Sequence, residues 1–132
     1  MSIRKVRVLV AEDDEVSGKA ARTMLERLGC SVDVVADGSD AVQLFRKQDY
    51  DLILMDGHMP SMSGIEATAL IRALPGGEAT PIIGTTSGRS HQEYLQSGMN
   101  EVVPKPFLLE NMRYILSRWT RWTGLATSET QA

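Results

Sequence analysis

The chain has 132 residues, about the length of one domain. Its 14 basic and 17 acidic residues give a net charge of −3, which disfavours binding to nucleic acids or anionic membranes, because both need clustered cations. No segment approaches the ~20 consecutive apolar residues of a membrane span, and the single cysteine excludes an internal disulfide and a multi-cysteine metal site. We therefore expect a cytoplasmic, single-domain protein with no membrane insertion and no nucleic-acid partner.

The apolar pattern alternates between short continuous runs, typical of buried strands, and helical spacing. It predicts strands at residues 6–11, 32–35, 52–55, 81–85 and 101–103, and helices at residues 15–28, 39–47, 64–74, 90–97 and 107–119. Asp14 is suited to cap the first helix and Gly29 to end it. The alternation predicts an α/β fold with a parallel sheet covered by helices on both faces. We expect the domain to span residues 5–122, followed by a flexible C-terminal tail at residues 123–132.

Polar side chains follow the predicted strands at the edge where open parallel sheets bind ligands. Glu12 and Asp13 follow the first strand, Asp56 the third, Thr86 the fourth and Lys105 the fifth. Carboxylates gathered in this way repel one another, so protonation, a lysine or a divalent cation must offset the repulsion. Donor groups that are all oxygen favour a hard ion such as Mg²⁺. With a lysine and a threonine added, the set suits phosphoryl transfer, in which a carboxylate can act as nucleophile.

Four segments of the chain combine a predicted strand with the polar residues that follow it. They read VLVAEDDEVS, LILMDGHMPSMSGIEAT, PIIGTTS and VVPKPF. In their order and spacing they resemble the receiver domains of two-component response regulators. The stretches EDDEVS and GIEATALIR are most like receivers of hybrid histidine kinases or phosphorelays. The resemblance implies a flavodoxin-like (βα)5 fold, a doubly wound sheet of five parallel strands in the order 2-1-3-4-5 with helices on both faces.

The resemblance also implies a metal site and a phosphorylation site. Mg²⁺ would be bound by Asp13 and Asp56, by the backbone carbonyl of His58, and by Glu12 through a water. Asp56 would accept a phosphoryl group from a histidine kinase or a histidine-containing phosphotransfer protein.

Two further residues would contact the phosphoryl group. Thr86 would donate a hydrogen bond to a phosphoryl oxygen and Lys105 would pair with it, next to a cis peptide bond between Lys105 and Pro106. The domain would catalyse only its own phosphorylation and dephosphorylation, and would signal by altered protein contacts or pass the phosphoryl group on. We expect a monomer or a weak dimer.

The chain departs from the family at several positions. Val102 stands where the family has a switch aromatic, three residues before Lys105, and Gly57 replaces a commonly bulky residue after Asp56. The usual aromatic movement is therefore not available, which keeps open a pseudo-receiver that serves as an interaction module without phosphorylation. A Mg²⁺-dependent aspartyl-phosphate phosphohydrolase is the other alternative. It is disfavoured because Gly57 and His58, rather than a second acid, follow Asp56.

Overall fold

The computed structural model describes residues 4–88 and 91–124. Five parallel strands form one sheet in the order β2-β1-β3-β4-β5. The strands are β1 (Arg7–Ala11), β2 (Ser31–Val35), β3 (Leu52–Asp56), β4 (Ile82–Thr86) and β5 (Glu101–Pro104). They alternate with the helices α1 (Glu15–Arg27), α2 (Gly38–Lys47), α3 (Gly64–Arg72), α4 (His91–Gln96) and α5 (Leu109–Trp119). The predicted flavodoxin-like fold and its strand order are confirmed.

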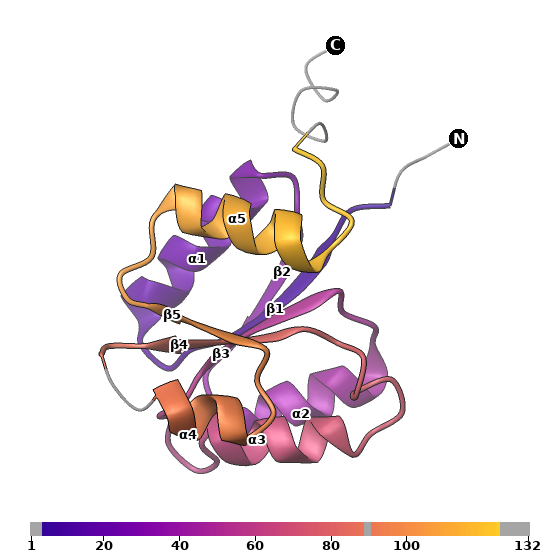
Figure 1. Ribbon diagram of the computed structural model, residues 1–132, viewed down its shortest axis with the longest axis vertical. Helices are drawn as coiled ribbons and strands as arrows, with labels where there is room; N and C mark the ends of the chain where they lie inside the picture. Colours follow the sequence, from indigo (N-terminus) through magenta and orange to yellow (C-terminus); the bar gives the residue numbers. More distant parts are fainter. Residues whose placement is uncertain (1–3, 89–90, 125–132) are drawn as a thin grey trace.

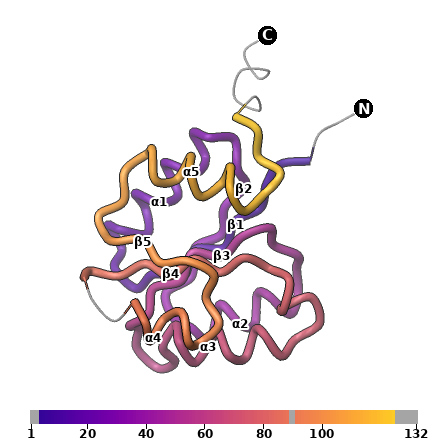
Figure 2. The backbone as a smooth tube through the Cα atoms, in the orientation of Figure 1, coloured from indigo at the N-terminus to yellow at the C-terminus, as the bar shows by residue number. Residues whose placement is uncertain are grey.

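The sheet lies between two layers of helices. Helices α1 and α5 cover one face, and α2, α3 and α4 cover the other (Figures 1 and 2). Successive side chains of a strand point to opposite faces, so Leu52 and Leu54 of β3 pack in the α1/α5 layer while Ile53 and Met55 pack in the other. All four are at most 1% exposed, which explains why this strand is apolar throughout rather than alternating.

The ends of several elements differ from the sequence-based prediction. Strand β3 extends to Asp56, which pairs with Thr85 of β4, so the phosphoacceptor candidate belongs to the sheet itself. Helix α5 begins at Leu109 instead of residue 107, because Phe107 is buried in the core and the side chain of Asn111 accepts the backbone N–H of Leu108 at 2.6 Å. These corrections reflect tertiary contacts that local periodicity does not contain.

Two predictions involve residues outside the described ranges. The fourth helix was predicted to start at residue 90, which lies outside them, and the described helix starts at His91. Most of the predicted tail, residues 125–132, also lies outside. Within residues 4–88 and 91–124, no helix has the length and apolar character that crossing a membrane requires.

The parallel register brings the carboxyl ends of the strands to one edge of the sheet. Thr86 at the end of β4 pairs with Pro104 of β5, and Asp56 at the end of β3 pairs with Thr85. Ala11 ends β1 opposite Met55. The loops that leave these three central strands therefore start next to one another, and they carry the polar residues singled out in the sequence.

Candidate functional site

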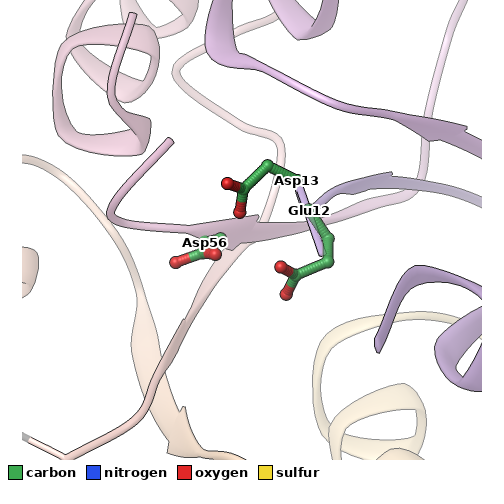
Figure 3. Close-up of side chains that lie close together, drawn as sticks. All are labelled: Glu12, Asp13 and Asp56. Atoms are coloured by element: carbon green, nitrogen blue, oxygen red, sulfur yellow. The ribbon is translucent and has the colours of Figure 1, made fainter. Parts of the chain in front are cut away.

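Three carboxyl groups meet at this edge of the sheet. Glu12 and Asp13 follow β1, and Asp56 is the last residue of β3. The three side chains end in the same small space (Figure 3), and each offers an oxygen within 4.8 Å of the others. Glu12 and Asp56 are each only 6% exposed, whereas Asp13 is exposed to solvent. Two buried acids and one open acid thus share one site.

Lys105 supplies the positive charge at this site. Its Nζ donates to Oε1 of Glu12 at 2.6 Å and to Oδ2 of Asp56 at 3.2 Å. The backbone N–H of Lys105 donates to the carbonyl of Thr86 at 2.7 Å, which extends the β4–β5 pairing by one bond past the strand end. The Lys105–Pro106 peptide bond is cis, as the resemblance implies.

The pKa values of the two tightly paired groups, Glu12 and Lys105, are both raised, but by different causes. Burial raises the pKa of Glu12, and the hydrogen bond from Lys105 offsets this increase only in part. Burial by itself would lower the pKa of Lys105. The hydrogen bond to Glu12 and the negative charge of Asp56 outweigh that effect, so the pKa of Lys105 is raised. Lys105 therefore stays charged at neutral pH and stabilises the ionised acids beside it.

The donor set at the site fits a magnesium ion. Every side-chain ligand atom of the cluster is a carboxylate oxygen, which Mg²⁺ prefers over nitrogen or sulfur ligands. Three carboxyl groups against one ammonium also leave an excess of negative charge for a cation. The backbone N–H of His58 donates to Oδ1 of Asp56 at 3.1 Å, so the main chain of His58 lies at the site. His58 as a whole is exposed to solvent.

Thr86 lies one residue beyond the position on β4 that pairs with Asp56. Its side chain is 3% exposed, and its hydroxyl oxygen accepts the backbone N–H of Gly88 at 3.2 Å. The structure thus brings Thr86 to the same edge as Glu12, Asp13, Asp56 and Lys105. The neighbouring Thr85 is a buried residue of β4.

Asp14 serves the helix rather than the cluster. Its carboxylate accepts the backbone N–H of Ser17 at 2.9 Å and the hydroxyl of Ser17 at 2.7 Å, which caps α1. The backbone N–H of Asp14 donates to Oε2 of Glu12 at 3.0 Å. This hydrogen bond fixes the carboxylate of Glu12. The two hydrogen bonds from Ser17 confirm the predicted capping role of Asp14.

A groove of about 460 Å³ opens beside the acidic cluster. Helix α1 lines it with Gly18, Lys19 and Arg22, and the end of β2 lines it with Val34 and Val35. No local pattern in the sequence predicts this groove, because it forms only when α1 packs beside β2.

One residue near the site was missed by the sequence analysis. Tyr94 of α4 is 0% exposed and packs against the backbone of Gly57, directly after Asp56. In the sequence, a tyrosine in a short helix cannot be distinguished from an ordinary core residue. Gly57 and Gly84 are distant from it in the chain, so no local pattern indicates that they face it.

The family assignment follows from the site and from comparison with known proteins. A sequence profile of the response regulator receiver domain matches residues 8–117. This chain belongs to the response regulator receiver domain family. The predicted membership is therefore confirmed, and the chain is a signalling module of two-component and phosphorelay systems.

Relatives of this receiver domain occur in larger proteins. The transcription factor SKN7 of Saccharomyces cerevisiae is 40% identical over 117 residues, which cover 86% of this chain and 18% of SKN7. The chain therefore spans less than a fifth of this curated relative.

Two solved structures are informative about the site. The receiver domain of the sensor histidine kinase PA1611 from Pseudomonas aeruginosa PAO1 is 39% identical, with a TM-score of 0.83 over 88% of this chain and 98% of that chain. That crystal structure has a magnesium ion coordinated in the active-site cleft. The receiver domain of the response regulator Ssk1 from Saccharomyces cerevisiae, in complex with the histidine phosphotransfer protein Ypd1, is 25% identical, with a TM-score of 0.80 over 90% of this chain and 91% of that chain.

Proposed function

We propose that this receiver domain accepts a phosphoryl group on Asp56, in a Mg²⁺-dependent reaction with a phosphohistidine. The donor is a histidine kinase or a histidine-containing phosphotransfer protein. The observation that carries the proposal is the position of the Asp56 carboxylate, which lies within 4.8 Å of Glu12 and Asp13 and 3.2 Å from the ammonium of Lys105.

The phosphoryl transfer is a single displacement. A carboxylate oxygen of Asp56 attacks the phosphorus, the P–O bond forms as the P–N bond breaks, and the electron pair of the broken bond stays on the imidazole nitrogen, which then takes a proton. Lys105 pairs with the transferred group, and the hydroxyl of Thr86 donates to one of its oxygens. Mg²⁺ held by Asp13 and Asp56, by the carbonyl of His58 and by Glu12 through a water would neutralise the equatorial oxygens.

The surface beside the cluster suits a docking partner. Val16 of α1 is 76% exposed, and the groove of about 460 Å³ lies next to the same helix. The Ypd1–Ssk1 complex supports a phosphotransfer protein as the partner, because Ssk1 contributes a receiver domain to it. We further propose that the functional unit spans residues 5–122 and works in the cytoplasm as a monomer or weak dimer.

The substitution Asp56→Asn tests the proposal. With phosphoramidate as a small P–N phosphodonor, the wild-type domain should become phosphorylated in Mg²⁺, and both Asp56→Asn and removal of Mg²⁺ by EDTA should abolish the product. The readout is intact-protein mass spectrometry. Asp14→Asn is the matched control, because Asp14 caps α1 and lies outside the cluster.

The alternative functions give distinct results in this experiment and in two related assays, with a phosphorylated phosphotransfer protein and with small phosphate esters. Full-rate phosphorylation of Asp56→Asn contradicts the assignment of the acceptor. No phosphorylation of the wild type by phosphoramidate or by a phosphorylated phosphotransfer protein indicates a pseudo-receiver. Steady release of phosphate from small phosphate esters indicates a phosphohydrolase.

A further inference from the structure

The hydroxyl group of Tyr94 is buried without a hydrogen-bond partner. Tyr94 is 0% exposed, and among the described residues its Oη is one of two buried side-chain polar atoms that lack a partner. Buried polar groups are nearly always paired, since leaving one unpaired is costly, so an exception next to a reactive group calls for an explanation.

Two glycines make the space that holds this tyrosine. A Cβ atom at Gly57 would lie 2.1 Å from the Oη of Tyr94, and a Cβ atom at Gly84 would lie 2.7 Å from its Cδ2. Gly57 directly follows Asp56, and Gly84 lies on β4, two residues before Thr86. Any other side chain at either glycine would displace the ring. The tyrosine therefore packs between the residue that follows β3 and the middle of β4.

The hydroxyl end of Tyr94 faces the loop that leaves Asp56. The neighbouring His58 donates its backbone N–H to Asp56 at 3.1 Å, and its ring lies edge-on to the Tyr94 ring at 6.2 Å. A phosphoryl group on Asp56 adds negative charge and three acceptor oxygens next to the carboxylate to which this N–H donates, which changes the surroundings of the main chain at residues 57 and 58. The Gly57 carbonyl accepts the N–H of Gly64 at 3.1 Å and has a second lone pair available.

The far end of α4 is held in place by α3. The guanidinium of Arg72 donates to the carbonyl of Gly98 at 2.9 and 2.6 Å and to Oδ1 of Asn100 at 2.8 Å. The segment just after α4 is therefore fixed, while Tyr94 contacts the loop after Asp56. Val102 of β5, which pairs with Gly84, carries no aromatic ring. The aromatic contact with the site thus comes from α4.

We propose that Tyr94 is a positioning residue of the phosphorylation site. When Asp56 carries a phosphoryl group, the Tyr94 hydroxyl donates a hydrogen bond to an oxygen of the loop after Asp56, such as the Gly57 carbonyl. This bond stabilises the loaded state and links it to the position of α4. The proposal rests on the proposed function, because it needs Asp56 to be the acceptor.

The substitution Tyr94→Phe removes only the hydroxyl. It should leave the free energy of unfolding and Mg²⁺ affinity of the unloaded domain unchanged or slightly higher, because the lost hydroxyl has no partner there. The affinity for beryllium trifluoride, a phosphoryl analogue, in the presence of Mg²⁺ should fall about three- to tenfold, the net effect of one hydrogen bond. Tyr114→Phe is the matched control, since Tyr114 is 52% exposed on α5.

Two further measurements separate this role from simple packing. Ultraviolet resonance Raman spectra of the wild type should show a tyrosine hydroxyl changing from unpaired to donating when the analogue binds, and Tyr94→Phe should lose this change. Amide hydrogen exchange in α4 should slow on analogue binding in the wild type and less so in Tyr94→Phe.

The outcomes distinguish the two proposals. If the wild type neither binds the analogue nor accepts phosphate, the proposed function fails. If the wild type does both and Tyr94→Phe binds the analogue equally well, the role of Tyr94 is refuted. A loss of analogue affinity that is matched by an equal loss of stability in the unloaded domain also refutes it.

Discussion

Lys105, directly after β5, lies between two acids from other parts of the sheet, Glu12 after β1 and Asp56 at the end of β3. Its ammonium lies 2.6 Å from Glu12 and 3.2 Å from Asp56. Both acids are buried, so their charges depend on a nearby cation much more than surface charges do. Lys105 provides such a cation, and we expect it to compete with a divalent ion that binds the same cluster of acids.

The substitution Lys105→Met tests this competition. Without divalent ions, the variant should lose about 1–3 kcal/mol of unfolding free energy, because two buried acids lose the charged hydrogen-bond donor that Lys105 supplies. Its Mg²⁺ affinity should rise about tenfold at low ionic strength, because a repelling charge has been removed. Urea unfolding and calorimetric Mg²⁺ titration measure the two effects. Lys19→Met, at an exposed position of α1, is the control. Unchanged or weaker Mg²⁺ binding in Lys105→Met would contradict the argument.

Among the helices, α3 owes much of its placement to its two ends. Its first turn carries a capping box, in which Ser63 and Glu66 each accept the other's backbone N–H at 3.1 Å. Its last turn carries Arg72, which donates to the carbonyls of Gly77 and Thr80 at 2.6 and 2.7 Å as well as to Gly98. One side chain thus joins α3 to the segments before β4 and after α4.

We expect Arg72→Ala to lower the free energy of unfolding by about 2–4 kcal/mol, since several hydrogen bonds from a charged donor are lost together. Arg72→Lys should recover only a small part, because an ammonium cannot span the same acceptors. Urea unfolding gives the values, and amide exchange should accelerate first near Gly98. Arg118→Ala is a suitable control, as this exposed arginine of α5 makes only a 3.8 Å ion pair with Glu101 among the described salt bridges. Equal effects of the two alanine variants would rule out a special role for Arg72.

At the scale of the whole molecule, the residues that follow α5 contact segments from the N-terminal part of the chain. The indole N–H of Trp122 donates to the carbonyl of Leu28 at 2.7 Å, and the ring is 8% exposed in the α1/α5 layer. Arg121 donates to Asp51 at 2.9 Å and to the backbone carbonyl of Lys5 at 3.0 Å. These contacts tie the segment after α5 to the start of the sheet and the end of α1, and the proposed domain boundary at residue 122 lies directly after them.

Two variants test this boundary. Trp122→Ala should lower the unfolding free energy by about 3–5 kcal/mol, because it removes a large buried ring and leaves the Leu28 carbonyl without its donor. If the proposed boundary is right, a chain that ends after residue 122 should stay within about 0.5 kcal/mol of the full chain, the range of changes that remove no core contact. Urea unfolding compares both with the full chain. A shortened chain as unstable as Trp122→Ala would move the boundary towards the C-terminus.

The sequence by itself determined the order and type of the elements. Continuous apolar runs such as that of β3 and helical spacing such as that of α5 are local properties, so they can be recognised without any tertiary contact. The same pattern places an acid or a lysine directly after buried strands, and parallel strands necessarily gather those residues at one edge. The resemblance to receiver domains then supplied a role for Glu12, Asp13, Asp56, Thr86 and Lys105, and those roles stay predictions.

Only the tertiary structure decided which of these groups are in contact. The pairing of Lys105 with Glu12 joins residues separated by 93 positions, and the fit of Tyr94 into the space left by Gly57 and Gly84 joins three separate elements. Such contacts depend on strand register and on how each helix packs across the sheet. Local periodicity carries no information about either, because the free energy that fixes them arises only when distant segments exclude water together.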